Sequence, residues 1–131
     1  MYSKTIVVGH LGRDPELRYT QAGDGVCSFS VATSRKYTNK VGEKIEETTW
    51  FKVAVWGKMG EACQEYLKKG SLVLVEGELQ ADKSTGGPNV YEKKDGTSGA
   101  SFEIRAFAVK FLSTKTNDEK ETSPESVEDM I

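Results

Sequence analysis

The chain has 131 residues, enough for one compact domain with a tail and too few for two full cores. Its 18 Lys and Arg stand against 20 Asp and Glu, and this net charge of -2, taken alone, argues against a dedicated nucleic-acid binder. No apolar run approaches the roughly 18 residues of a membrane-spanning helix, and the N-terminus lacks the pattern of a signal or transit peptide. We therefore expect a cytoplasmic domain without a membrane partner.

Short β-branched and aromatic segments separated by turns predict five strands. The first covers residues 5–10 and continues past two glycines towards residue 19. The other four cover residues 26–37, 48–56, 72–80 and 101–112. In the second strand, Cys27, Phe29 and Val31 alternate with small residues, which is typical of a strand with one buried face.

One helix is predicted between the third and fourth strands. Its apolar positions follow helical spacing, and Gly70 occupies the place of a C′ residue: Met59, Ala62, Cys63, Tyr66 and Leu67 form the stripe. The order of three strands, a helix and two strands is that of an OB-fold. We therefore predict an all-β, five-stranded Greek-key barrel with one helix between strands three and four.

Two hairpin loops and a tail complete the predicted organisation. Residues 38–47 and 81–99 are rich in glycine and charge and are interpreted as loops. Residues 1–113 form the domain and carry 16 Lys and Arg against 14 Asp and Glu. Residues 114–131 carry 2 against 6, have no apolar pattern, and are predicted to be a disordered acidic tail. The acidity of the chain therefore belongs to the tail.

Metal, cofactor and catalytic motifs are not found in the sequence. Cys27 and Cys63 occupy apolar-periodic positions, which favours two buried thiols over a disulfide. With His10 they cannot supply a zinc site unless carboxylates are recruited. No phosphate-binding loop, nucleophile elbow or metalloprotease motif occurs. We expect no metal, no cofactor and no enzyme activity.

The third strand carries the strongest functional signal. Alternation places Phe51, Val53 and Val55 on the core face, and it leaves Trp50 and Trp56 outside together with Lys52. Two outward tryptophans can pack under a loop or into a subunit interface. Across the groove of an OB-fold, however, aromatic rings interleaved with cations are what an unpaired nucleic-acid strand requires, because bases stack on rings and cations neutralise phosphates.

Other candidates flank this strand. Lys58 follows Trp56 closely, and Tyr37 ends the second strand beside Arg35. Tyr91 lies in the long hairpin before the last strand, where a solvated loop tyrosine is nearly as good an interpretation. The lysines of residues 38–47 are mixed with glutamates and are more typical of a solvated face.

Several runs together resemble the bacterial single-stranded DNA-binding proteins. They are VVGHLGRDPELRY over residues 7–19, FSVATS over 29–34, TWFKVAVWGK over 49–58, EYLKKGS over 65–71 and VEGEL over 75–79. The resemblance implies an OB-fold that assembles as a homotetramer and wraps single-stranded DNA without sequence preference or catalysis. It further implies roles in replication, recombination and repair.

The resemblance assigns roles residue by residue. It implies stacking by Trp50, Trp56 and Tyr37, with Tyr91 restoring the register after an insertion at residues 82–89. It implies phosphate contacts by the basic residues at matching positions, to which we add two arginines as candidates: Lys52, Lys58, Lys69, Arg13 and Arg35. His10 stands where the family usually has Asn, a departure without a mechanical interpretation.

The tail departs from the family pattern. The family ends in acidic residues followed by Pro-Phe, which dock on replication and repair proteins; here the sequence has Glu128, Asp129, Met130 and Ile131. We expect this segment to bind such partners weakly or to bind different ones.

Two other classes of function remain open. The first is an OB-fold accessory module (a primosome-type subunit) or a single-stranded RNA binder. The second is a small nuclease, which is disfavoured because no acidic residues are predicted to cluster in the groove.

Overall fold

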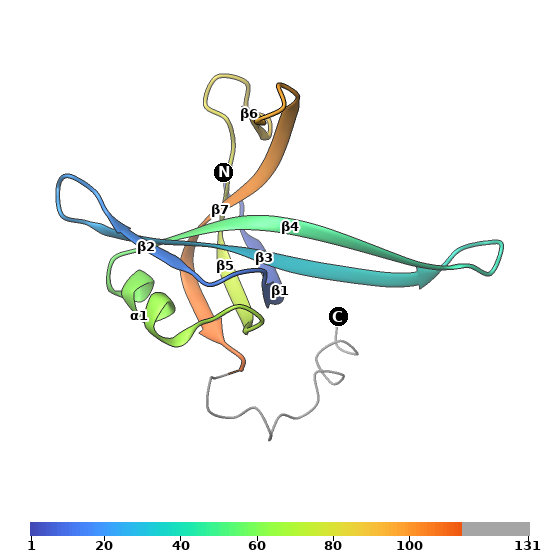
Figure 1. The fold of residues 1–131 in the computed structure, drawn as a ribbon, viewed down its shortest axis with the longest axis horizontal. Coiled ribbons are helices and arrows are strands. Elements are labelled where there is room, and N and C mark those ends of the chain that lie inside the picture. The colour runs from blue at the N-terminus through green and yellow to red at the C-terminus, as the bar shows by residue number, and fades with distance from the viewer. Residues whose placement is uncertain (114–131) are drawn as a thin grey trace.

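A closed barrel forms the centre of residues 1–113, the part of the chain that the computed structural model describes (Figure 1). The elements are β1 (Thr5–Leu11), β2 (Glu16–Tyr19), β3 (Gly25–Thr38), β4 (Lys44–Trp56), α1 (Lys58–Tyr66), β5 (Leu72–Gln80), β6 (Asn89–Glu92) and β7 (Ser98–Phe111). The barrel order is β1-β5-β7-β4-β3, and β3 closes the circle by pairing with β1. These five strands, with α1 between the third and the fourth, confirm the predicted OB-fold.

The barrel interior is filled by side chains from the predicted core faces. The buried apolar residues are Val7, Leu11, Cys27, Phe29, Val31, Val53, Val55, Cys63, Leu67, Val73, Val75 and Ile104. Phe51, predicted to be in the core, is only half-buried; it packs against the core, and its ring centroid lies 5.8 Å from that of Phe102. Most of these residues are β-branched and come from strands, as a small, tightly filled barrel requires.

Burial also explains the state of the two cysteines. Both thiols are free and buried. Removal from water disfavours a thiolate, so burial raises the pKa of Cys27 to about 11 and that of Cys63 to about 12. The nearby Cys27 contributes to the shift at Cys63. The interpretation of these residues as small core side chains therefore agrees with the structure.

The predicted first strand is two strands. β1 ends at Leu11, and β2 begins at Glu16 and pairs with β3. Pro15 lies in the interruption and has no backbone N–H to donate to a ladder. The Asp14 carboxylate accepts a hydrogen bond from the Lys69 backbone N–H at 2.8 Å, which ties the connection to the segment after α1.

The helix is slightly shorter than predicted. α1 ends at Tyr66, and Leu67 is its C-cap, so Gly70 lies in the following turn and is not the C′ residue. Of the predicted stripe, Cys63 and Leu67 are buried, whereas Met59 is exposed. The helix therefore covers the barrel with a narrower face than its spacing indicated.

The hairpin of β3 and β4 is longer than predicted and projects well beyond the barrel (Figure 1). We call its outer part, residues 34–48, the arm. Pairing continues from Val26 opposite Trp56 to Thr38 opposite Lys44, so most of the predicted loop at residues 38–47 is strand. The turn is closed by the Asn39 carboxamide oxygen, which accepts from the backbone N–H groups of Val41 at 3.1 Å and Glu43 at 2.9 Å.

The loop predicted at residues 81–99 contains a further short strand. β6 pairs with the start of β7, which begins three residues earlier than the sequence predicted. The Asp95 carboxylate accepts hydrogen bonds from the Thr97 hydroxyl at 2.6 Å and the Thr97 backbone N–H at 3.0 Å, and these bonds lower the pKa of Asp95. This local network closes a second hairpin above the barrel.

No helix within residues 1–113 is long and apolar enough to cross a membrane. The tail assigned to residues 114–131, including its last four residues, lies outside the described residues.

Candidate nucleic-acid interface

The outward face of β4 carries the two predicted aromatics. Trp50 is 52% exposed and Trp56 41% exposed, and Lys52 is exposed between them. Val53 and Val55 are buried on the opposite face. The alternation deduced from the sequence therefore holds, and the tryptophans are outside the core.

Two adjoining hollows cover this face. The first encloses about 540 Å³ and includes Trp50, whereas the second encloses about 600 Å³ and includes Trp56. Arg13, Ser30 and Lys52 line both hollows, so the hollows form one continuous depression across β3, β4 and β7. We call this depression the groove.

The β3 side chains paired with the outward positions of β4 are small, and two of them, Ser28 and Ser30, line the groove. The β3 residues opposite the outward positions of β4 are Ala32 beside Trp50, Ser30 beside Lys52, and Ser28 beside Ala54. None of these side chains is large enough to cover an indole ring. The ring faces stay open to a flat ligand such as a base.

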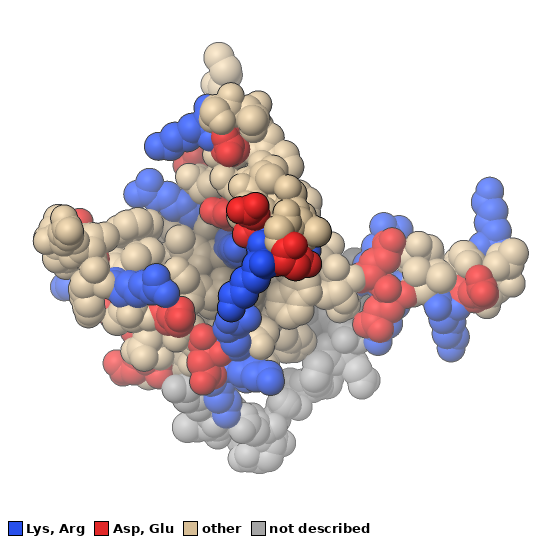
Figure 2. All heavy atoms as spheres, turned by 45° about the horizontal axis from the view of Figure 1, so that its top comes forward, with Lys and Arg blue, Asp and Glu red and all other residues tan. Residues whose placement is uncertain are grey.

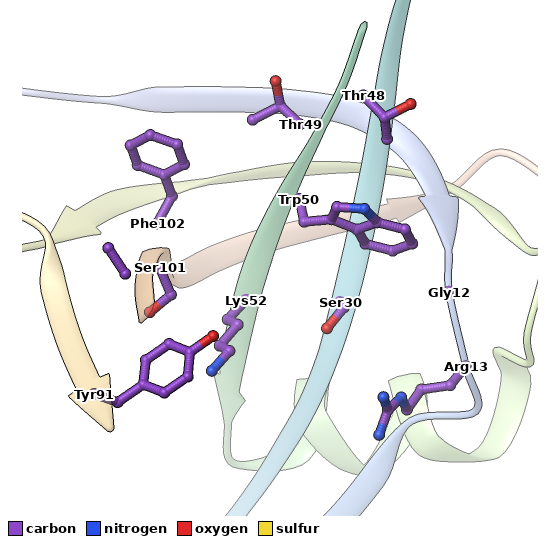
Figure 3. Close-up of a pocket in the computed structure, with 11 residues that line it drawn as sticks. Gly12, Arg13, Ser30, Thr48, Thr49, Trp50, Lys52, Tyr91, Ser101 and Phe102 are labelled. Carbon is purple, nitrogen blue, oxygen red and sulfur yellow. The ribbon is translucent and has the colours of Figure 1, made fainter. Parts of the chain in front are cut away.

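A glycine sets the position of Trp50. A Cβ at Gly12 would lie 2.5 Å from Cζ3 and 2.7 Å from Cη2 of the Trp50 ring, closer than such contacts occur. Figure 3 shows the indole directed towards the loop that contains Gly12 and Arg13. Gly12 therefore leaves room for the Trp50 ring at one edge of the groove, and Arg13 places a cation at the same edge.

Tyr91 closes the opposite edge of the first hollow. The Lys52 Nζ lies 4.8 Å from the centroid of the Tyr91 ring, a cation–π contact. Tyr91 pairs with Gly99, and a Cβ at that glycine would lie 2.7 Å from Cζ of Tyr91, so the ring lies across the bare backbone. In Figure 3, Lys52 on β4 reaches towards Tyr91 on β6. The hairpin tyrosine is thus part of the groove.

Tyr37 and Arg35 lie on the arm and line neither hollow. The Arg35 guanidinium carbon is 4.9 Å from the Tyr37 ring centroid, and Tyr37 is 38% exposed. Tyr37 pairs with Ile45 and contributes to a separate hollow of about 400 Å³. The arm therefore offers its own aromatic surface at a distance along the hairpin from Trp50.

Charges on the arm are of both signs. Arg35 lies opposite Glu47, and Lys36 lies opposite Glu46. Figure 2 shows blue and red side chains interspersed along the projecting hairpin. The arm therefore carries both positive and negative charges, in agreement with the mixture of lysines and glutamates in the sequence.

Lys58 and Lys69 do not line the groove. Lys58 begins α1, shortly after Trp56, and Lys69 follows the helix. The Lys69 backbone is joined to Asp14, which lines the second hollow. Both lysines are therefore candidates for the continuation of a binding path past the Trp56 end of the groove.

Sequence reasoning missed the contributions of β5 and β7 to the groove. Phe102 lines the first hollow, and Gln80, Glu103 and Arg105 line the second. These residues reach the groove because of how the strands pair. Lys52 lies beside Glu103 in the parallel β4–β7 ladder, and Gln80 lies beside Glu103 in the β5–β7 ladder. The strand patterns alone do not fix that register.

The expectation that no acidic residues cluster in the groove needs correction. Asp14, Glu16 and Glu103 all line the second hollow. Even so, no group of three or more His, Cys, Asp or Glu within residues 1–113 is arranged to hold a metal ion.

A comparison with models of protein families identifies the family of this chain. Residues 2–112 match the model of the Single-strand binding protein family. The chain belongs to that family. It is 41% identical over 110 residues to a single-stranded DNA-binding protein of Neisseria meningitidis, across 84% of this chain and 59% of that protein. A protein of the same name from Xanthomonas campestris is 49% identical over 84 residues, across 64% of this chain and 49% of that protein.

Solved structures show the same fold. The Plasmodium falciparum SSB in complex with ssDNA matches with a TM-score of 0.70 and 23% identity, over 86% of this chain and 97% of that one. A small single-stranded DNA-binding protein from Streptomyces coelicolor matches with a TM-score of 0.67 and 21% identity, over 83% and 93% of the two chains. These matches confirm the fold, whereas the family model matched over residues 2–112 confirms the family resemblance stated from the sequence.

Proposed function

We propose that this family member binds single-stranded DNA through the groove and protects it in replication, recombination and repair. One observation carries the proposal: two exposed tryptophans flank a lysine on one barrel strand, in an open depression that small side chains of β3 also line. Stacking on Trp50, Trp56 and Tyr91 supplies about 1 to 3 kcal/mol for each base, whatever the base. Broad sequence tolerance follows from this mechanism.

Cations along the path neutralise the phosphates. Arg13 and Lys52 lie in the groove, Lys58 and Lys69 extend the path at one end, and Arg35 extends it on the arm with Tyr37. Lys52 leaves its contact with Tyr91 for a phosphate when DNA enters, which frees the tyrosine face for a base. Affinity therefore decreases as salt increases.

The proposed assembly is a homotetramer. Support comes from β1, whose pairing with β3 is limited to His10 and Leu11, so the backbone edge of its first residues has no strand partner within residues 1–113. Ile6 on this strand is 57% exposed. A free edge beside an exposed apolar side chain is a surface suited to a second copy of the chain.

Further parts of the proposal concern partners and location. The acidic segment Glu128-Asp129 with Met130-Ile131 recruits replication or repair proteins. The protein acts with cytoplasmic, nucleoid-associated DNA, and it binds the strand without cleaving it.

The decisive experiment is a fluorescence titration with oligo-dT of about 35 and 70 nucleotides, combined with native mass. Stacking quenches Trp50 and Trp56, and quenching requires more oligomer at higher salt. A tetramer gives four chains in each complex. Stronger binding of oligo-U than of oligo-dT would indicate an RNA binder, and a monomer without quenching would indicate an accessory module.

A further inference from the structure

The single histidine of the chain lies on the outward face of the barrel, near Trp50. His10 is exposed on β1, with Ala32 of β3 opposite it on one side and Leu72 of β5 on the other. Ala32 in turn lies opposite Trp50 of β4. Because side chains opposite one another in a ladder point to the same face of a sheet, His10, Ala32 and Trp50 form one row. This row spans about 10 Å, since neighbouring strands lie about 4.8 Å apart.

The row lies where the arm leaves the barrel. The pairing of β3 with β1 includes Val31 and Ala32, and the arm begins at residue 34. The Trp50 ring reaches Gly12, the second residue after His10, where a Cβ would lie 2.5 Å from the ring. His10 is therefore at the junction between the groove and the arm, the two regions that the proposed function assigns to DNA.

The two strands that form this junction carry no lysine or arginine there. Residues 30–34 of β3 are SVATS, and residues 48–51 of β4 are TTWF. Arg13 lies on the groove side of the junction and Arg35 on the arm side. Because single-stranded DNA carries a phosphate at every nucleotide, a strand that extends from one arginine to the other places phosphates over an uncharged stretch. A cation contributed by β1 would fill this gap.

The sheet around His10 leaves the imidazole open to a ligand. Within residues 1–113, no charged side chain occupies the outward positions next to it on the strands that flank β1. Besides Ala32 and Leu72, its outward neighbours are small or apolar, namely Val8, Gly12, Ser30, Ser34 and Leu74. These strands therefore offer a proton on the ring neither a carboxylate that holds it nor a cation that repels it.

The charged groups that follow His10 in the chain are engaged elsewhere. Arg13 lines both hollows, so its side chain is directed into the groove. The Asp14 carboxylate accepts a hydrogen bond from the Lys69 backbone N–H at 2.8 Å. No ion pair among residues 1–113 includes His10. A phosphate is thus the kind of partner that a protonated His10 lacks.

We propose that His10, once protonated, binds a phosphate of single-stranded DNA where the strand passes from the groove to the arm. A histidine side chain ordinarily gains its proton as the pH falls from about 8 to about 5, so affinity rises as the pH falls through this range. The bound phosphate in turn favours the protonated imidazole, and protons are taken up on binding. The inference rests on the proposed function, because it assumes that DNA follows the groove and the arm.

The test is the affinity of the full chain for oligo-dT at about pH 6 and about pH 8, with an oligomer long enough to reach from the groove to the arm. At fixed salt, wild type should bind about threefold more tightly at the lower pH. The slope of log affinity against log salt should be steeper there by up to about 0.7, the value for one more phosphate contact on a single strand.

This pH range isolates the histidine. Carboxyl groups ordinarily titrate below it and lysines above it. Burial raises the pKa of Cys27 to about 11 and that of Cys63 to about 12, so both thiols keep their protons throughout. Thymine exchanges no proton between these pH values. An α-amino group also titrates here, and every variant below retains it.

Three variants make the result specific to this position. His10→Asn keeps a polar side chain that cannot be protonated, and it should bind equally at both pH values. His10→Lys is charged at both, and at the higher pH it should bind as tightly as wild type does at the lower one. Gln64→His, added to His10→Asn, places a histidine on the exposed side of α1 and should not restore the pH dependence.

The outcomes separate the role of His10 from the proposed function. Wild-type affinity that is the same at both pH values would overturn the role of His10, as would a pH dependence that persists in His10→Asn. Native mass is expected to be the same at both pH values. A change of mass with pH that His10→Asn abolishes would assign the residue to a subunit contact and overturn the proposal. If wild type binds oligo-dT at neither pH, the proposed function itself fails.

Discussion

The groove and the arm are two candidate DNA-contacting regions that share strands β3 and β4. In the groove, Trp50 and Tyr91 are positioned by close packing against glycines, and Lys52 contacts one of the rings. On the arm, a single ring, Tyr37, lies among cross-strand pairs of opposite charge. The rings of the groove are therefore held in place by packing, as the proposed binding of DNA requires, whereas the arm carries its ring on a long two-stranded projection.

This difference indicates that the groove should contribute more of the affinity for DNA than the arm. Preorganised rings lose little freedom on binding, so most of their stacking energy appears as affinity. A projecting hairpin must be ordered against the strand, and its opposite charges partly cancel. The predictions below test whether the groove dominates and how much the arm adds.

The largest effect is expected for the combined Trp50→Ala and Trp56→Ala variant. Losing two stacking platforms should weaken oligo-dT binding by about 2 kcal/mol or more, which is about 30-fold. Titration by anisotropy of a labelled oligomer measures this without relying on tryptophan emission. Affinity equal to that of wild type would remove the groove from the binding path.

A smaller effect is expected for Lys52→Ala. Loss of one phosphate contact should reduce the slope of log affinity against log salt by about 0.7 and weaken binding about fivefold at moderate salt. Lys44→Ala, on the arm opposite Thr38, is the matched control and should change the slope less. An equal change in this slope for Lys52→Ala and Lys44→Ala would contradict the expected difference between the groove and the arm.

Gly12→Ala tests preorganisation directly. Its Cβ would displace the Trp50 ring, which lies 2.5 Å away at the nearest atom, so affinity should decrease about threefold. Because the displaced atoms belong to the end of an exposed side chain, the melting temperature should change little. Gly25→Ala meets the exposed Tyr19 ring at 3.2 Å outside the groove and should leave binding intact.

The smallest effect is expected for Tyr37→Ala, about twofold in affinity for a long oligomer. An oligomer too short to extend from the groove to the arm should show no loss. Tyr19→Ala, an exposed tyrosine on β2, is the control. A loss as large as that of the double tryptophan variant would make the arm the principal site.

The sequence predicted the elements whose signal is local. Alternation in residues 50–56 correctly separated Trp50 and Trp56 from Val53 and Val55, because the side chains of a strand point to opposite faces in turn. Helical spacing located α1, and the order of elements indicated the barrel. The loop predicted at residues 38–47 is shorter in the structure, because the Asn39 side chain accepts two local hydrogen bonds that close a tight turn. Composition does not reveal these hydrogen bonds.

Features that depend on strand register could not be predicted. Glu103 lies next to Lys52 only because β7 runs parallel to β4 with one particular offset, and Phe102 reaches Phe51 for the same reason. No pattern within either strand encodes that offset. The acidic lining of the second hollow was consequently overlooked.

The place of β7 between β4 and β5 has a consequence for synthesis on the ribosome. Every strand that β7 joins precedes it in the chain, yet both β4 and β5 keep an open edge until residues 98–111 have left the exit tunnel. Nascent chains thus display two unpaired strand edges from the emergence of β5 until β7 emerges. Rapid release of the last strand, rather than early pairing of the first, limits how long they remain exposed to one another.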